Sequence, residues 1–152
     1  MTNYFLGADL GGTKTHVLIA DQHGRVLGFG EAGPGNPEGV GYDGMFAVLE
    51  LGTRQALQRA GLSIDQVCGA GFGVGGFDWD SQRGDMCATI DRLGLQAPYA
   101  LVNDTILGLV AGAEEGWGVA VVSGTGCNCR GWDRTHQREG RVSGYGAIMG
   151  EG

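Results

Sequence analysis

Residues 4–20 read YFLGADLGGTKTHVLIA, and this stretch decides how the chain begins to fold. Its two apolar segments, 4–10 and 14–20, flank the turn Gly11-Gly12-Thr13, so the pattern predicts two strands joined by a tight glycine turn. A second turn at 21–24 leads into residues 25–31, which predict a third strand. We therefore expect the chain to open with three consecutive antiparallel strands.

The segments after residue 32 alternate between helix and strand patterns. The predicted elements are a helix over about 42–60 that Gly61 ends, a strand over 67–73, a helix over 81–93, a strand over 98–103 and a helix over 105–113. Because the last helix is apolar on nearly every side, we expect it to be buried. A strand meander followed by crossovers predicts the α/β class, with a mixed five-stranded sheet flanked by helices as in the ribonuclease-H-like fold.

A second hairpin pattern occupies the last part of the chain. Residues 117–122 and 127–132 predict strands, and Ser123-Gly124-Thr125-Gly126 predicts the turn between them. This likeness to the opening hairpin indicates a duplicated domain. We expect a first domain over 1–115 and, over 116–152, the opening hairpin of a second domain of the same type whose remainder is absent.

Composition narrows the class of protein. With 42% hydrophobic and 18% charged residues and no long apolar run or signal peptide, the chain is expected to be globular and cytoplasmic. The net charge is −7 and the basic residues are scattered, so we expect no nucleic-acid or membrane partner and instead a small molecule. The four cysteines form no C-x-x-C pair and have no neighbouring His ligands, which favours reduced thiols.

Two glycine turns are candidates for binding phosphate, because such turns present backbone N–H groups with no side chain in the way. They are Gly11-Gly12-Thr13 and Gly124-Thr125-Gly126. Asp9 precedes the first turn by two residues and could hold Mg²⁺ beside the phosphates. Lys14 is the only lysine of the chain, and both a phosphate contact and an exposed strand-end position fit it.

Other nucleotide-binding motifs fit the sequence less well. The Walker A motif is absent, since Thr13 separates Gly12 from Lys14. The pattern G-x-G-x-x-G occurs from Gly28 and again from Gly71, but with 32 glycines in 152 residues such matches arise by chance. A Rossmann site would also need an opening βαβ unit, which a three-strand start does not provide.

Asp104 follows an apolar strand, at the edge where open α/β sheets place their ligands. As part of Asn103-Asp104-Thr105 it could cap the next helix, or it could act as a general base for a substrate hydroxyl. Its position in the sequence leaves both roles open.

Several of these stretches together resemble one protein family. Residues 7–15 (GADLGGTKT) resemble the first phosphate motif of actin-like sugar kinases, and residues 121–130 (VVSGTGCNCR) resemble the second phosphate motif of N-acetylglucosamine kinases and their BadF/BadG/BcrA/BcrD-type ATPase relatives. The same family is matched, in order, by Asn36, Gly75-Gly76 and residues 102–105. The ending of the sequence, through Met149-Gly150-Glu151-Gly152, resembles the family's substrate loop.

The resemblance implies transfer of the γ-phosphoryl group of Mg-ATP to an amino sugar such as N-acetylglucosamine or glucosamine. Asp104 would be the base that activates the sugar hydroxyl, and Asp9 would hold Mg²⁺. The phosphates would contact Gly11, Gly12, Thr13, Lys14, Ser123, Gly124, Thr125 and Gly126. The sugar would contact Asn36, Gly75, Gly76, Asp104, Thr125 and Glu151. A homodimer is a further partner to consider.

Two departures from the family pattern leave alternatives open. Cys127 stands where the kinases often have Ser, and Glu151 where Asp is usual, so the sugar is undetermined. Relatives that activate reductases or dehydratases carry an iron–sulfur cluster, but Cys127 and Cys129 lie inside the phosphate hairpin and resemble packed thiols. The family's adenosine site follows the substrate loop, so we expect a fragment of a kinase, with a non-catalytic sugar-binding module as the alternative.

Overall fold

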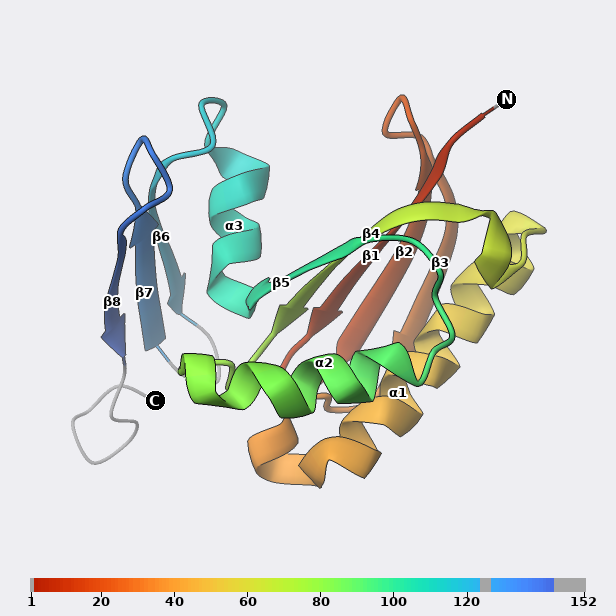
Figure 1. The fold of residues 1–152 in the computed structure, drawn as a ribbon, viewed down its shortest axis with the longest axis horizontal. Helices are drawn as coiled ribbons and strands as arrows, with labels where there is room; N and C mark the ends of the chain where they lie inside the picture. Colours follow the sequence, from red (N-terminus) through yellow and green to blue (C-terminus); the bar gives the residue numbers. More distant parts are fainter. Residues whose placement is uncertain (1, 124–126, 144–152) are drawn as a thin grey trace. The chain divides into compact units, whose positions relative to one another are not determined.

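The computed structural model describes residues 2–123 and 127–143, and its contacts divide the chain into two units, Met1–Val102 and Asn103–Gly152. The first unit contains a five-stranded sheet whose strand order is β3-β2-β1-β4-β5 (Figure 1). Its strands are β1 (Tyr4–Leu10), β2 (Thr15–Asp21), β3 (Val26–Ala32), β4 (Val67–Val74) and β5 (Tyr99–Asn103). β1 pairs antiparallel with β2 and parallel with β4, so the predicted mixed sheet is confirmed.

Two helices cover one face of this sheet. They are α1 (Pro37–Ala60) and α2 (Arg83–Asp91), and single 3-10 turns precede β4 and α2 at Ile64–Gln66 and Asp80–Gln82. Both helices contribute to one core cluster, in which Met45 and Met86 pack with sheet residues such as Leu6 and Val17. Because side chains alternate along a strand, the neighbours Phe5 and Leu18 lie on the opposite face and are exposed.

The start of α1 differs from the prediction by one short turn. Gly41 has φ 69° and ψ 171°, so it interrupts the helix where the predicted helix begins. Residues 37–40 form an extra turn, which the Asn36 side chain caps and Pro37 begins. Gly61 ends the helix in the left-handed conformation, as the sequence predicted.

α1 lies very close to the edge strand β3 because two glycines face it. A Cβ atom on Gly28 would lie 2.0 Å from the carbonyl oxygen of Ala56, and one on Gly30 would lie 2.0 Å from that of Gly52. No side chain fits between such backbones. These glycines therefore set how closely the helix and the strand approach.

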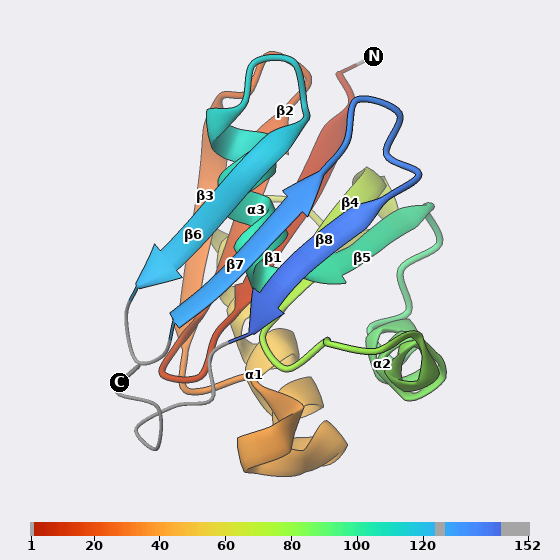
Figure 2. The ribbon, with the colours of Figure 1, turned by 90° about the vertical axis from the view of Figure 1, so that its left-hand side faces the viewer.

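The second unit combines one helix with a three-stranded antiparallel sheet (Figure 2). Its elements are α3 (Asp104–Gly112), β6 (Gly118–Ser123), β7 (Cys127–Trp132) and β8 (Glu139–Ser143). Gly108 faces Ala120, since a Cβ atom on Gly108 would lie 3.9 Å from that side chain. The predicted hairpin is confirmed, and β8 extends it to a third strand.

The prediction that the helix over 105–113 is buried holds for only part of its surface. Ile106 and Leu109 are buried, but Val110 is 58% exposed, because α3 packs on β6 and β7 with one face only. The contacts group α3 with this second sheet, and the predicted domain boundary between residues 115 and 116 stays a prediction. No helix among the described residues is long and apolar enough to cross a membrane.

Candidate functional site: the loops at one end of the first sheet

The glycine turn between β1 and β2 is held by its own backbone. Gly11 N–H donates to the carbonyl oxygen of Lys14 at 3.0 Å, which closes the turn. Gly12, Thr13 and Lys14 are exposed, and a Cβ atom on Gly12 would meet no other atom within 4 Å. The turn beyond Gly11 is therefore exposed, and the predicted contact with phosphate stays a prediction.

Two further loops attach to the same turn. The N–H groups of Gly35 and Asn36 both donate to the carbonyl oxygen of Gly11, at 2.9 and 3.2 Å. Gly75 N–H, just after β4, donates to the carbonyl oxygen of Leu10 at 2.8 Å. Since β1 and β4 are parallel, their carboxyl ends meet at one edge of the sheet, where open α/β sheets bind ligands. The structure thus brings the predicted residues of the first unit together.

Asn36 and Gly76 are in contact at this edge. The Asn36 side-chain oxygen accepts a hydrogen bond from Glu38 N–H at 2.9 Å and so caps α1. Gly76 has φ 78°, and a Cβ atom there would lie 2.4 Å from the Asn36 Oδ1 atom. Only glycine fits this place, because both the backbone conformation and the close approach to Asn36 exclude a side chain.

Asp9 lies near the end of β1, between His16 of β2 and Gly73 of β4. Burial raises the pKa of Asp9 above its ordinary value, and the positive charges of His16 and Lys14 act in the opposite direction. His16 is itself fixed, since its Nε2 atom lies 3.0 Å from the Oε2 atom of Glu31. The electrostatic interaction with His16 and Lys14 thus partly offsets the effect of burial on the pKa of Asp9.

The side chains at this edge suit Mg²⁺ better than a metal whose ligands all come from the protein. Within residues 2–123 and 127–143, no group of three or more His, Cys, Asp or Glu side chains could hold a metal. Mg²⁺ in phosphoryl-transfer sites usually keeps several waters and takes one or two carboxylates plus phosphate oxygens. A single carboxylate, Asp9, beside a phosphate-binding turn is consistent with that arrangement.

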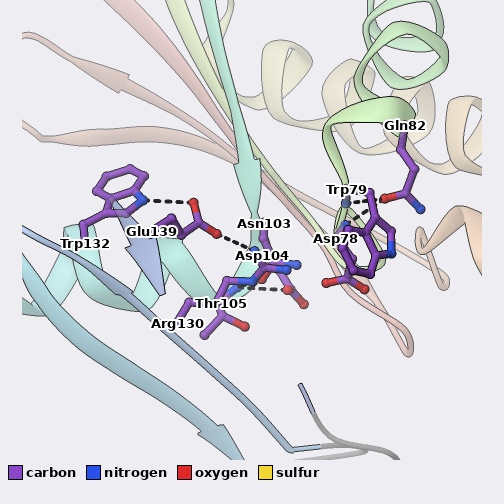
Figure 3. Close-up of polar contacts among 9 residues, drawn as sticks. All are labelled: Asp78, Trp79, Gln82, Asn103, Asp104, Thr105, Arg130, Trp132 and Glu139. Carbon is purple, nitrogen blue, oxygen red and sulfur yellow. Dashed lines mark hydrogen bonds and ion pairs between the residues drawn. The ribbon is translucent and has the colours of Figure 1, made fainter. Parts of the chain in front are cut away.

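Two features of this end of the first unit were missed by the sequence analysis. Thr15 is fully buried where β2 begins, and its Oγ1 atom lies under Gly35, where a Cβ atom would be 2.4 Å away. Gln82 accepts the N–H groups of Asp78 and Trp79, both at 2.8 Å, and so fixes the loop after Gly76 (Figure 3). For Gln82, the signal in the sequence was a glutamine just before a helix, and this pattern is too common to be specific.

Asp104 belongs to the second unit, where it is the first residue of α3. The cap position is Asn103, whose side-chain oxygen accepts Thr105 N–H at 3.0 Å. The Asp104 carboxylate also accepts that N–H, at 2.9 Å. Asp104 is therefore not needed as the helix cap, and its role as a base stays a prediction.

The remaining predicted residues lie at the second hairpin and the end of the chain. Ser123 is the last residue of β6 and is exposed. Gly124, Thr125, Gly126 and Glu151 lie outside the described residues, so the predictions for them stay predictions. Cys127 and Cys129 pair with Ser123 and Val121 of β6, which places both thiols on one face of β7.

The sequence matches the BadF/BadG/BcrA/BcrD ATPase family over residues 6–151. An N-acetylmuramic acid/N-acetylglucosamine kinase from Clostridium acetobutylicum is 30% identical over 148 residues, which are 97% of this chain and 48% of that protein. An N-acetyl-D-glucosamine kinase from Dictyostelium discoideum is 26% identical over 159 residues, or 97% of this chain and 49% of that protein. The chain thus spans about half the length of the curated relatives it matches.

The fold is also found among solved structures. The crystal structure of a candidate N-acetylglucosamine kinase from Porphyromonas gingivalis matches with a TM-score of 0.77 at 22% identity, over 97% of this chain and 50% of that one. A likeness at this identity shows the fold alone. Together with the observed strand order, it confirms the predicted α/β class with a mixed five-stranded sheet flanked by helices.

Proposed function

Since the chain belongs to the BadF/BadG/BcrA/BcrD ATPase family, we propose that it serves an ATP-dependent kinase whose substrate is N-acetylglucosamine, glucosamine or a related amino sugar. The observation that carries the proposal is the joining of three loops at one sheet edge. The hydrogen bonds to Gly11 and Leu10 attach the loop over 33–36 and the end of β4 to the glycine turn. The kinase names of the two curated relatives support the same activity.

The phosphates would lie against the two glycine turns. In the first unit, the backbone N–H groups of Gly12 and Thr13 and the ammonium of Lys14 would face phosphate oxygens. Gly11 would contribute by closing the turn, since its N–H donates to the carbonyl oxygen of Lys14. In the second hairpin, Ser123 and the residues 124–126 would act in the same way. Asp9 is the residue that would hold Mg²⁺, which when bound would neutralise part of the phosphate charge.

Asp104 would be the general base. Its carboxylate would accept the proton of the attacking sugar hydroxyl while the hydroxyl oxygen forms a bond to the γ-phosphorus and the bond to the ADP oxygen breaks. The sugar would contact Asn36, Gly75, Gly76, Thr125 and Glu151. Because the Asn36 side chain is fixed by capping α1 and by its contact with Gly76, it would present the same orientation to each sugar.

The test is ADP release by the purified protein with ATP and Mg²⁺, with and without N-acetylglucosamine or glucosamine. We expect release to require the sugar, and to fall by about 10²- to 10⁴-fold in Asp104→Asn while the circular dichroism spectrum is retained. Asp85→Asn is a matched control, because Asp85 is also an acidic residue in the first turn of a helix. ADP release that does not depend on a sugar would favour an ATPase activator instead.

The location and the partners follow from the proposed reaction. An ATP-consuming reaction, together with four free cysteines, suits a reducing compartment, so we place the protein in the cytoplasm. Its partners would be ATP and the amino sugar. A homodimer is a separate expectation that sedimentation velocity would test.

A further inference from the structure

The sheet of the second unit has a face that α3 does not cover. Ala120 of β6 faces α3 at Gly108, so α3 packs on the side of the sheet where Ala120 lies. Since side chains alternate along a strand, Val119 and Val121 lie on the opposite side. Both are largely exposed, at 69% and 67%, and Figure 2 views the strands from this side, with α3 behind them.

This uncovered face is apolar across all three strands. Val121 pairs with Cys129 of β7, and Cys129 pairs with Val142 of β8, so the three side chains form one row. Val142 is 70% exposed. Antiparallel sheets with one face in water usually place polar residues on that face, and this row has none. We call Val119, Val121, Cys129 and Val142 the valine face. An exposed apolar patch of this kind marks a contact with another segment or molecule.

The first sheet contains rows at the same distance from its glycine turn. The two hairpins are compared by counting back from the last paired residue before each turn, which is Leu10 in the first and Ser123 in the second. The rows two and four residues back are Ala8–Val17–Gly30 and Leu6–Ile19–Gly28 in the first sheet, and Val121–Cys129–Val142 and Val119–Gly131–Gly140 in the second. The valine face thus corresponds to these two rows of the first sheet.

In the first sheet a helix covers these rows. Their residues are buried, and the backbone of α1 comes so close to Gly28 that a Cβ atom there would lie 2.0 Å from the carbonyl oxygen of Ala56. Gly140 has the position of Gly28 in the second sheet, but a Cβ atom on it would meet no described atom within 4 Å. The space that α1 fills over the first hairpin is therefore open over the second.

We propose that the valine face is the docking surface for an amphipathic α-helix, which packs on it as α1 packs on the first sheet. The helix belongs to the polypeptide that corresponds to the half of the curated relatives that this chain does not match. Its contact side carries no charge, because the valine face offers no charged partner. Where it crosses Gly140 it has a small residue, as α1 has Gly52 and Ala56 opposite β3.

The first experiment adds the part of the Clostridium acetobutylicum kinase that this chain does not match, produced as a separate chain. Iodoacetamide labels the free thiols, and mass spectrometry follows Cys129, with the exposed Cys68 as the internal reference. We expect the added chain to slow the labelling of Cys129 by about 10-fold or more, because a thiol under a docked helix reacts only when the helix opens. The labelling of Cys68 should not change.

Val121→Lys is the test variant, because the docked helix would bury its ammonium without a partner. It should remove the protection of Cys129. Val110→Lys is the matched control, since Val110 is an exposed valine of α3 in the same unit, and it should keep the protection. Labelling of Cys129 that does not slow, or that slows equally in Val121→Lys, would overturn the proposal.

A fusion makes the test independent of association between two chains. The same part of the Clostridium kinase is joined behind residue 152, and thermal unfolding is measured with and without Val121→Lys. We expect the substitution to lower the unfolding temperature of the fusion by several degrees and that of the 152-residue chain much less, because Val121 is exposed there. Equal shifts in the two proteins would contradict a docked helix.

A second copy of this chain is the competing occupant of the valine face. Sedimentation velocity of the 152-residue chain tests it, and we expect Val121→Lys to leave the sedimentation coefficient unchanged. A wild-type dimer that becomes a monomer in Val121→Lys but not in Val110→Lys would assign the face to the second copy and overturn the proposal. None of these measurements requires turnover, so a failure of the proposed kinase reaction would be distinguished from a failure of this inference.

Discussion

The environment of Asp9 affects both the stability of the fold and the proposed binding of a ligand. Burial raises its pKa, so the folded protein favours the protonated carboxyl relative to the unfolded chain. The resulting stability is present below the ordinary pKa of 3.8 and is lost as pH rises through the higher pKa of the folded state. Above that pKa the ionised carboxylate of Asp9 therefore destabilises the fold, which is consistent with the proposed ligand-binding role.

We predict that Asp9→Asn raises the unfolding temperature at pH 7 by about 1–3 °C and lowers ATP-Mg²⁺ affinity. The gain should disappear near pH 3, where Asp9 is protonated in both states. Asp21→Asn should do the opposite, because backbone N–H groups of Arg25 and His23 hold the pKa of Asp21 below its ordinary value. Thermal melts of both variants between pH 3 and pH 7 give the comparison, and a loss of stability in Asp9→Asn at pH 7 would contradict the sign.

At the scale of elements, the glycines of β3 show what a sequence pattern leaves undecided. Gly28 and Gly30 belong to a G-x-G-x-x-G match that arises by chance and does not indicate a nucleotide site. In the structure, these two glycines have a packing role instead. Their spacing of two places them on one side of the strand, facing α1. The sequence does not show which helix crosses which strand, so this close approach could not be derived before the structure.

We predict that Gly30→Ala lowers the free energy of unfolding by about 1–3 kcal/mol, since the added Cβ would lie 2.0 Å from the carbonyl oxygen of Gly52 and α1 must move away. Gly33→Ala is the control, because nothing lies within 4 Å of a Cβ atom at Gly33. Urea unfolding of both variants is the measurement. An equal effect of the two substitutions would show that the contact between α1 and β3 tolerates a methyl group.

Helix boundaries illustrate a different limit. The end of α1 at Gly61 and the strand limits of the first sheet agree with the predictions to within one or two residues, because turn residues mark them. The extra turn over 37–40 was missed although Asn36-Pro37 is a recognised start signal, since the apolar periodicity begins only after Gly41. The turn residues thus predicted the end of α1 more accurately than its start.

At the scale of the whole molecule, element order and apolar alternation predicted a mixed five-stranded sheet flanked by helices, because a meander followed by crossovers leaves few topologies. The strand order β3-β2-β1-β4-β5 came from the structure. The loops of the site were also predictable, as residues that follow strand ends. The association of α3 with the second sheet was not, since an apolar helix can pack against any apolar surface. The ion pair of Arg130 and Glu139 was not predictable either, because it depends on the register of β7 and β8.

The three loops of the first unit belong to different elements, so a ligand that contacts all of them should stabilise the folded protein. A ligand at about 100 times its Kd contributes about 2.7 kcal/mol, which for a chain of this size corresponds to a rise of roughly 5 °C or more in unfolding temperature. We expect N-acetylglucosamine to produce such a rise and Asn36→Ala to reduce it, whereas Asp104→Asn should keep much of it while losing turnover. A wild-type protein whose unfolding temperature does not respond to millimolar amino sugar would contradict the sugar site, whatever its ATPase activity.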